Sequence, residues 1–284
     1  KLFLGGCFIF VLMAAAIGSV VFAYLVQELP APEELTNRKI IQSTKIFDRG
    51  GETLLYEIHG EEKRTVVPWD QIPDYLKQAT IAIEDKNFYS HPAFDWRALS
   101  RALVNSLFKG EVQGGSTITQ QLAKNVFLSR EKTIWRKIRE IVLSLQIEKR
   151  YSKNQILEIY LNQIPYGGNS YGVEAAALTY FGKHVSEITL AEAALLASLP
   201  QAPSYYSPWG RHTDELRQRK NYVLERMYEL DFIDEEEKTR TVESEIAIAP
   251  ESTGGIKAPH FTLMVKEYLT DKYGEEMVVS CGLK

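Results

Sequence analysis

The sequence predicts a mainly α-helical domain behind a single membrane-spanning helix at the N-terminus. The first observation is that residues 2–26 contain no charged side chain. The second is a succession of apolar patterns with helical spacing between residues 73 and 245, several of them opened by capping sequences. The third is the composition, with 45% hydrophobic and 25% charged residues, which is typical of a globular chain and excludes collagen-like and low-complexity proteins.

Residues 1–28 are predicted to form a transmembrane signal-anchor helix. A helix rises about 1.5 Å per residue, so the uncharged run is long enough to cross a hydrocarbon core of about 30 Å. A cleaved signal peptide is the alternative, but its apolar region is usually shorter, about 7–15 residues. Lys1 precedes the run and favours a cytoplasmic N-terminus. We therefore expect a single-pass protein of the inner (cytoplasmic) membrane, with its body on the extracytoplasmic side.

The body divides into a polar stalk at residues 29–44, a main domain at 45–245 and a C-terminal segment at 246–284 that begins with a linker. Residues 45–47 and 53–56 are β-prone and flank an Asp-Arg-Gly-Gly turn. This arrangement predicts a β-hairpin at the start of the main domain.

Helical patterns follow the hairpin. One begins at Pro73, which suits the start of a helix, and another is expected after Asp95, a good capping residue. Capping boxes at Thr117, Ser152 and Thr189 each precede an apolar run. Further helices are expected at residues 133–149, 171–181, 214–230, 234–245 and 260–273.

Charge and composition also limit the classes of partner. The net charge of −4 gives no reason to expect a nucleic acid. Two cysteines, Cys7 and Cys281, are too few for a disulfide framework. The five histidines lack metal-ligand spacing, so we expect no metal site and no obligatory cofactor, although a divalent cation (Mg or Mn) could assist a reaction.

The first chemical candidate is the pair of adjacent carboxylates Glu84 and Asp85, at the end of an apolar helix and followed by Phe88 and His91. A carboxylate half-buried against an aromatic ring has a raised pKa, which suits proton transfer near neutral pH. The alternative is a solvated helix end with Asp85 as ordinary surface charge.

The second candidate is the glycine-bearing loop that opens the helix at residue 117. Glycine permits close backbone approach, and a helix N-terminus offers unpaired N–H groups to an anion. The alternative is a plain capped turn. The residues concerned are Gly115, Ser116, Thr117, Gln121, Lys124 and Asn125.

The third candidate is the basic helix that carries Arg136, Lys137 and Glu140. These residues lie on the polar face of the predicted helix, where a solvated ion-paired surface is the ordinary interpretation. Residues 130–153, however, hold eight lysines and arginines against three glutamates in a chain of negative net charge. Such an excess would stabilise a polyanion such as a pyrophosphate, or contact anionic lipid.

A fourth segment at residues 155–162 reads as an apolar core helix. Glu158 and Asn162 share one face of it, four residues apart. We expect these two residues to support the site structurally rather than to take part in chemistry.

In this order, the segments resemble the peptidoglycan glycosyltransferase domain of bifunctional class A penicillin-binding proteins. The likeness extends from about residue 45 to residue 230. The matching motifs are residues 84–91, 115–125, 136–140, 156–162 with 180–183, and 190–197.

The resemblance implies a lysozyme-like fold with a membrane-proximal lobe, and the polymerisation of lipid II into glycan strands. Glu84 would be the general base that deprotonates the acceptor 4-hydroxyl, with undecaprenyl pyrophosphate as the leaving group. Glu140, the second catalytic candidate, would orient the neighbouring cations or the donor. Substrate binding would fall to Asp85, Phe88, Gly115, Ser116, Thr117, Gln121, Lys124, Asn125, Arg136 and Lys137.

The same resemblance suggests that residues 246–284 lead towards a transpeptidase domain whose activity this fragment lacks. The implied partners are lipid II, the growing lipid-linked glycan and the membrane, together with cell-wall synthesis proteins and moenomycin-type inhibitors. Two rival functions stay open: a lysozyme-like hydrolase, and a non-catalytic membrane scaffold. The basic helix argues against the hydrolase, because a neutral leaving group needs a proton whereas a pyrophosphate needs cations.

Overall fold

The computed structural model describes residues 43–51, 53–58, 63–91, 116–128, 133–251 and 258–280, together with Met13 and Leu35. The predicted transmembrane helix, most of the stalk and the helix expected after Asp95 lie outside the described residues. No helix within the described part of the chain is long and apolar enough to span a membrane.

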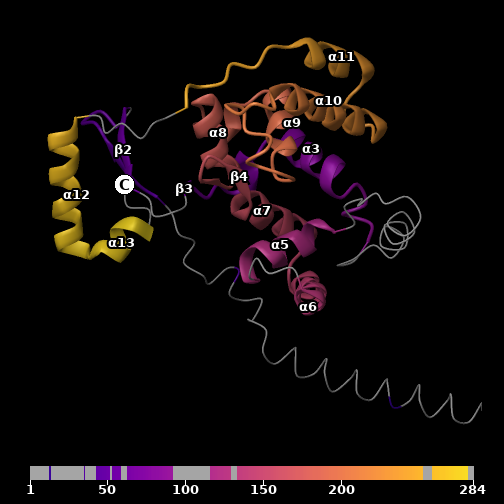
Figure 1. The fold of residues 1–284 in the computed structure, drawn as a ribbon, viewed down its shortest axis with the longest axis horizontal. Helices are drawn as coiled ribbons and strands as arrows, with labels where there is room; N and C mark the ends of the chain where they lie inside the picture. The colour runs from indigo at the N-terminus through magenta and orange to yellow at the C-terminus, as the bar shows by residue number, and fades with distance from the viewer. Residues whose placement is uncertain are drawn as a thin grey trace, which may run out of the picture.

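The structure is rich in helices, as the sequence predicts (Figure 1). Two short 3₁₀ turns, η1 (Trp69–Gln71) and η2 (Val185–Glu187), join the longer elements. The α-helices of the described residues are α3 (Asp74–Glu84), α5 (Ile118–Phe127), α6 (Ile134–Arg150), α7 (Lys153–Gln163), α8 (Val173–Phe181), α9 (Leu190–Ser198), α10 (Thr213–Glu229), α11 (Glu235–Glu243), α12 (Pro259–Tyr273) and α13 (Glu275–Ser280).

The helices begin where the capping sequences predict. Ser152 and Thr189 form reciprocal capping boxes with the residue three positions later, which satisfies backbone N–H groups of the first turns of α7 and α9. Thr117 accepts a hydrogen bond from the backbone of Gln120 at the start of α5. These local bonds set where α5, α7 and α9 begin.

Two small sheets accompany the helices. The predicted hairpin is confirmed: β1 (Thr44–Phe47) pairs antiparallel with β2 (Leu54–Ile58). A second sheet, with strand order β3-β5-β4, was not predicted from the sequence. In it β3 (Lys63–Arg64) runs parallel to β5 (Ser170–Tyr171), and β4 (Pro165–Gly167) is antiparallel to β5.

The main core lies between α3, α5, α6, α7, α8 and α9, and it includes the fully buried Phe88 and Tyr160. A neighbouring cluster uses small residues, such as Ala79 and Ala194, to bring α3, α9 and α10 close together. In Figure 1, α12 and α13 lie on the side of the hairpin, apart from the helical body; α12 contacts β2 and α13 contacts β1. Their apolar contacts with the hairpin form a third cluster around Ile46 and Val278.

Asn162 connects α7 to the segment that precedes α3. Its side chain accepts a hydrogen bond from the N–H of Val67 at 3.0 Å and donates to the carbonyl of Val67 at 2.9 Å. Glu158 accepts from the N–H of Trp69 at 3.1 Å. The expectation that Glu158 and Asn162 serve as structural support is confirmed, because their polar groups hold the backbone that leads into α3.

Candidate active site

Glu84 is the last residue of α3, and its two carboxylate oxygens have different surroundings. Oε2 accepts a hydrogen bond of 2.7 Å from Nε2 of Gln121, which lies on α5. Oε1 is buried and has no hydrogen-bond partner among the described residues. A buried carboxylate oxygen without a donor is expensive, so Oε1 is the atom most available to accept a proton.

The surroundings of Glu84 favour its neutral form. Burial is the largest effect on the pKa of Glu84 and raises it above its ordinary value. The hydrogen bond from Gln121 and the positive charges of Arg219 and Lys124 act in the opposite direction, while the charge of Asp85 adds to the increase. A carboxyl with a raised pKa is suited to exchange a proton close to neutral pH.

Asp85 has a different task from that of its neighbour. Its Oδ1 lies 2.6 Å from Nε2 of His91, and its Oδ2 accepts a hydrogen bond of 3.2 Å from the N–H of Ile118. The Asp85 side chain is only 8% exposed, and Phe88 is completely buried. The alternative of a solvated helix end is therefore wrong for Asp85, which joins the end of α3 to the beginning of α5.

Lys137 connects α6 with the beginning of α5. Its ammonium group donates to Oγ of Ser116 at 2.9 Å and to Oε1 of Gln120 at 3.3 Å, and it forms an ion pair with Glu140. The guanidinium of Arg136 lies 3.7 Å from the other oxygen of Glu140. The predicted loop and the predicted basic helix thus meet at one cluster of side chains.

Glu140 is only 2% exposed, so the interpretation of a solvated ion-paired face is wrong for this residue. The apolar pattern of α6 places Glu140 opposite the main core, but α5 packs against α6. A buried carboxylate is tolerated when cations surround it. Lys137 and Arg136 meet that condition.

Part of the positive charge of this region is neutralised inside the fold. Lys153 donates to Glu148 at 2.7 Å, and its ammonium lies 4.6 Å from the centre of the Phe88 ring. Glu148 also accepts a hydrogen bond from Thr119 on α5. Lys153 therefore joins α5, α6 and α7. The side chain of Lys137, by contrast, is 40% exposed.

The other predicted substrate-binding residues are distributed along α5. Ser116 and Thr117 stand at its beginning, Lys124 is partly buried one turn beyond Gln121, and Asn125 is exposed. Gly115 lies outside the described residues. The substrate-binding assignment of all these residues stays a prediction.

The comparisons with known proteins identify the family of this chain. A family model described as Transglycosylase matches residues 51–228, more than half of the chain. The chain belongs to the transglycosylase family. The resemblance found in the sequence motifs is thereby confirmed.

Several relatives of this transglycosylase carry the name penicillin-binding protein 1A. This chain is 43% identical to penicillin-binding protein 1A of Aquifex aeolicus, over 93% of this chain and 36% of the relative. It is 40% identical to penicillin-binding protein 1A of Escherichia coli K12, over 89% of this chain and 30% of the relative. A crystal structure of penicillin-binding protein 1A from Haemophilus influenzae matches 86% of this chain and 26% of that one, at 28% identity and a TM-score of 0.49. The chain spans about a third of the length of these curated relatives.

The transglycosylase fold also brings two residues to Glu84 that were not predicted as site residues. Tyr160 of α7 donates a hydrogen bond of 3.0 Å to Oε1 of Gln121, and it is fully buried. Arg219 of α10 donates to the carbonyl of Ser198 at 3.0 Å, and its charge acts on Glu84. The sequence distinguishes neither residue, because Tyr160 stands in an apolar run and Arg219 in a helix with several other cations.

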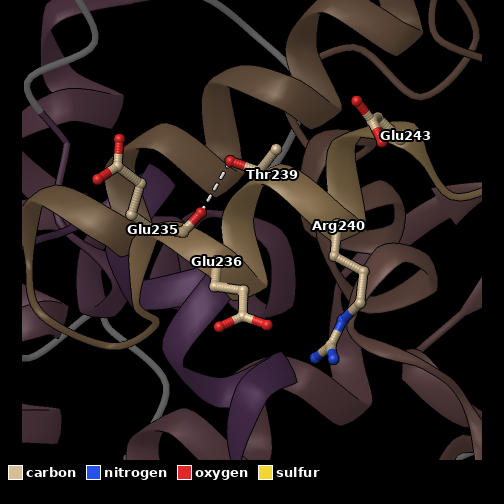
Figure 2. A pocket seen from close by; sticks show the side chains of 5 residues that line it. All are labelled: Glu235, Glu236, Thr239, Arg240 and Glu243. Atoms are coloured by element: carbon tan, nitrogen blue, oxygen red, sulfur yellow. Dashed lines mark hydrogen bonds between the residues drawn. The ribbon is translucent and has the colours of Figure 1, made fainter.

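A hollow on α11 differs from the Glu84 region, where side chains from several helices meet. Figure 2 shows its side chains, all from this single helix and all exposed. Thr239 donates to the backbone carbonyl of Glu235 at 2.8 Å, an ordinary bond within a helix. The hollow therefore has the character of solvated surface. The lining residues are Glu235, Glu236, Thr239, Arg240 and Glu243.

Proposed function

We propose that this transglycosylase polymerises lipid II into glycan strands during cell-wall synthesis, with Glu84 as the general base. The observation that carries the proposal is the asymmetry of the Glu84 carboxylate. One oxygen is held by Gln121, and the other is buried without a partner among the described residues. Such an arrangement suits a base, because one oxygen is fixed by a donor while the other has no donor and is left to accept a proton.

In the proposed reaction, Oε1 of Glu84 takes the proton of the acceptor 4-hydroxyl. The resulting nucleophilic oxygen forms a bond to the anomeric carbon of the donor sugar, and the bond from that carbon to undecaprenyl pyrophosphate breaks. The raised pKa of Glu84 supports this role, because a base is most effective when its pKa lies near the working pH.

The leaving pyrophosphate requires positive charge. Lys137 and Arg136 supply it in our proposal, and Glu140 holds both side chains in place through its two oxygens. Cations that are oriented before the reaction stabilise developing negative charge without reorganisation, which is their main advantage over water. Lys124 is the third cation we assign to this task, and Ser116 would contact the donor pyrophosphate.

We further propose that no cofactor is obligatory, because the side chains of α5 and α6 provide positive charge themselves. A divalent cation such as Mg or Mn would act as an optional helper. Polymerisation that persists in excess EDTA would support this statement, and its complete loss, restored by the metal, would contradict it.

The location follows from the substrate class in this proposal. Both sugars are attached to lipids, so the enzyme would work at the extracytoplasmic surface of the inner membrane, to which residues 1–28 would anchor it. The growing lipid-linked glycan would be its second substrate. Cell-wall synthesis proteins and moenomycin-type inhibitors stay expectations of the family resemblance.

The hydrolase alternative has less support. Glycosidases commonly use two carboxylic groups on either side of the bond that is cleaved. Next to Glu84 the second carboxylate is Asp85, and both of its oxygens are engaged, one with His91 and one with the backbone of Ile118.

The test is incubation of the detergent-solubilised chain with labelled lipid II, followed by separation of the products by size. We expect a ladder of glycans from the wild type and none from Glu84→Gln, which keeps the shape of the side chain but removes the base. Glu243→Gln, an exposed change on α11, is the matched control and should behave as the wild type. A normal ladder from Glu84→Gln would overturn the assignment of the base. In a separate incubation with pre-formed glycan strands, shortening of those strands would favour the hydrolase.

A further inference from the structure

Three side chains from three helices form a continuous hydrogen-bonded path that ends at Glu84. Tyr160 on α7 donates to Oε1 of Gln121 at 3.0 Å, and Nε2 of Gln121 on α5 donates to Oε2 of Glu84 at 2.7 Å. Tyr160 is fully buried. Water therefore cannot readily replace Gln121 as the hydrogen-bond partner of the Tyr160 hydroxyl.

The direction of the path depends on the Tyr160 hydroxyl. The carboxamide of Gln121 has one accepting end and one donating end. A hydroxyl that donates to Oε1 forces the NH₂ group to point towards Glu84. In the reverse orientation Oε1 of Gln121 would face an ionised carboxylate, so that two acceptors would repel each other.

Tyr160 is well suited to act as a permanent donor. Burial raises the pKa of Tyr160 well above its ordinary value, and the nearby charge of Glu84 raises it further. The hydroxyl thus keeps its proton throughout the pH range in which Glu84 titrates.

We propose that Tyr160 is a positioning residue which fixes the Gln121 carboxamide, so that Oε2 of Glu84 is held and Oε1 becomes the atom that receives the proton. This inference rests on the proposed function, in which Glu84 is the base. Tyr160 does not contact the substrate; it acts through Gln121.

Other groups also face Glu84 and set the background against which this effect is measured. Lys124 on α5 and Arg219 on α10 lower the pKa of Glu84, while Asp85 raises it. The hydroxyl of Tyr166 on β4 is buried, has no hydrogen-bond partner within the described part of the chain, and lies close enough for the charge of Glu84 to affect its pKa. Tyr160→Phe substitutes none of these residues, although Tyr160 itself lies within electrostatic reach of Tyr166 and Asp85.

The decisive variant is Tyr160→Phe, which keeps the ring and removes only the hydroxyl. A freely rotating Gln121 presents its donor to Glu84 less often, so the ionised carboxylate loses support. We expect kcat for polymerisation to fall about three- to tenfold, with little change in KM for lipid II. The acidic limb of the pH–rate profile should move to higher pH.

Tyr180→Phe is the matched control. Tyr180 is also fully buried, and its hydroxyl donates one hydrogen bond of 3.0 Å, to the carbonyl of Tyr166. Loss of that bond lowers stability in the same way, but it does not reach Gln121. The acidic limb should therefore stay where it is in the wild type.

Two further variants keep the inference testable if Tyr160→Phe is poorly folded. Replacement of Tyr160 by 4-aminophenylalanine keeps a donor at the same place and should restore the wild-type acidic limb. Gln121→Leu removes the intermediary, and adding Tyr160→Phe to it should shift the limb no further. Additive shifts would show that Tyr160 acts by another route and would overturn the inference.

The failure of this inference differs from the failure of the proposed function. If Glu84→Gln is inactive while Tyr160→Phe has the same pH profile as Tyr180→Phe, only the positioning role is refuted. If Glu84→Gln polymerises normally, the assignment of the base fails, and the positioning role fails with it.

Discussion

Replacing Lys137 by Met tests whether this lysine serves the reaction or only the fold. The change removes the ion-pair partner of the buried Glu140 and leaves Arg136 at 3.7 Å as the remaining cation. Breaking a fully buried pair costs about 3–5 kcal/mol. The Lys137 side chain is 40% exposed, so solvent weakens the pair and we expect a loss of about 1–2 kcal/mol in the free energy of unfolding.

The double variant Lys137→Met/Glu140→Gln separates the two roles. Removing both charges leaves no uncompensated carboxylate, so the double variant should be more stable than Lys137→Met by about 1 kcal/mol. Polymerisation should not recover, because the cation assigned to the pyrophosphate is still missing. Loss of one such preorganised group costs on the order of a hundredfold in kcat.

The assays are urea unfolding followed by circular dichroism, and the rate of glycan formation from labelled lipid II. Lys149→Met removes an exposed lysine from the same helix and should change neither quantity. Recovery of the rate together with stability in the double variant would refute the reasoning, because Lys137 would then matter only to the fold. Strictly additive losses of stability would show that the two side chains are not coupled.

Four other predictions concern the pH response and the backbone around the site. Burial raises the pKa of Glu84 above its ordinary value of 4.5. The rate of polymerisation should therefore decline on the acidic side at a higher pH than an ordinary glutamate would cause. An acidic limb of the pH–rate profile near pH 4.5 would contradict this. The fold favours the neutral form of Glu84, because burial raises its pKa. The resulting contribution to the free energy of unfolding is present below the unfolded pKa and is lost as the pH rises through the folded pKa. In thermal unfolding, Glu84→Gln should therefore be more stable than the wild type at pH 7 and equal to it at pH 4. Asn162→Ala leaves both polar groups of the Val67 backbone without their partner, and we expect a loss of about 2–4 kcal/mol in urea unfolding; a change below about 1 kcal/mol would mean that water replaces the amide. Gly172→Ala places a Cβ 2.7 Å from the carbonyl oxygen of Asn162 at a φ of +81°, so thermal unfolding should show a loss of at least about 2 kcal/mol, and a neutral result would mean that the backbone shifts easily.

Much of the helical framework could be predicted because its signals are local. The capping boxes at Ser152 and Thr189 involve residues three positions apart, and the structure contains both. The hairpin of β1 and β2 depends on one short turn. The adjacency of Glu84 and Asp85, with Phe88 one turn later, is likewise visible in the sequence and marks the candidate site.

The sheet of β3, β4 and β5 could not be predicted, because its strands contain two or three residues each and β3 lies far from the others in the sequence. The burial of Glu140 was missed for a related reason. A helical wheel describes one helix facing one core, whereas α6 is also covered by α5. Arg219 and the exposed Arg217 are equivalent by sequence, yet only Arg219 is placed where its charge acts on Glu84.

The sequence by itself determined which residues could carry the chemistry: two neighbouring carboxylates, a glycine-bearing helix start and a basic helix. The tertiary structure decided how the tasks are divided among them. Glu84 and Asp85 have nearly the same chemistry, but Asp85 has both oxygens engaged by His91 and Ile118, whereas one oxygen of Glu84 has no partner among the described residues. The physical reason is that the availability of a carboxylate oxygen depends on the donors that other helices bring to it, and those donors come from residues distant in the sequence.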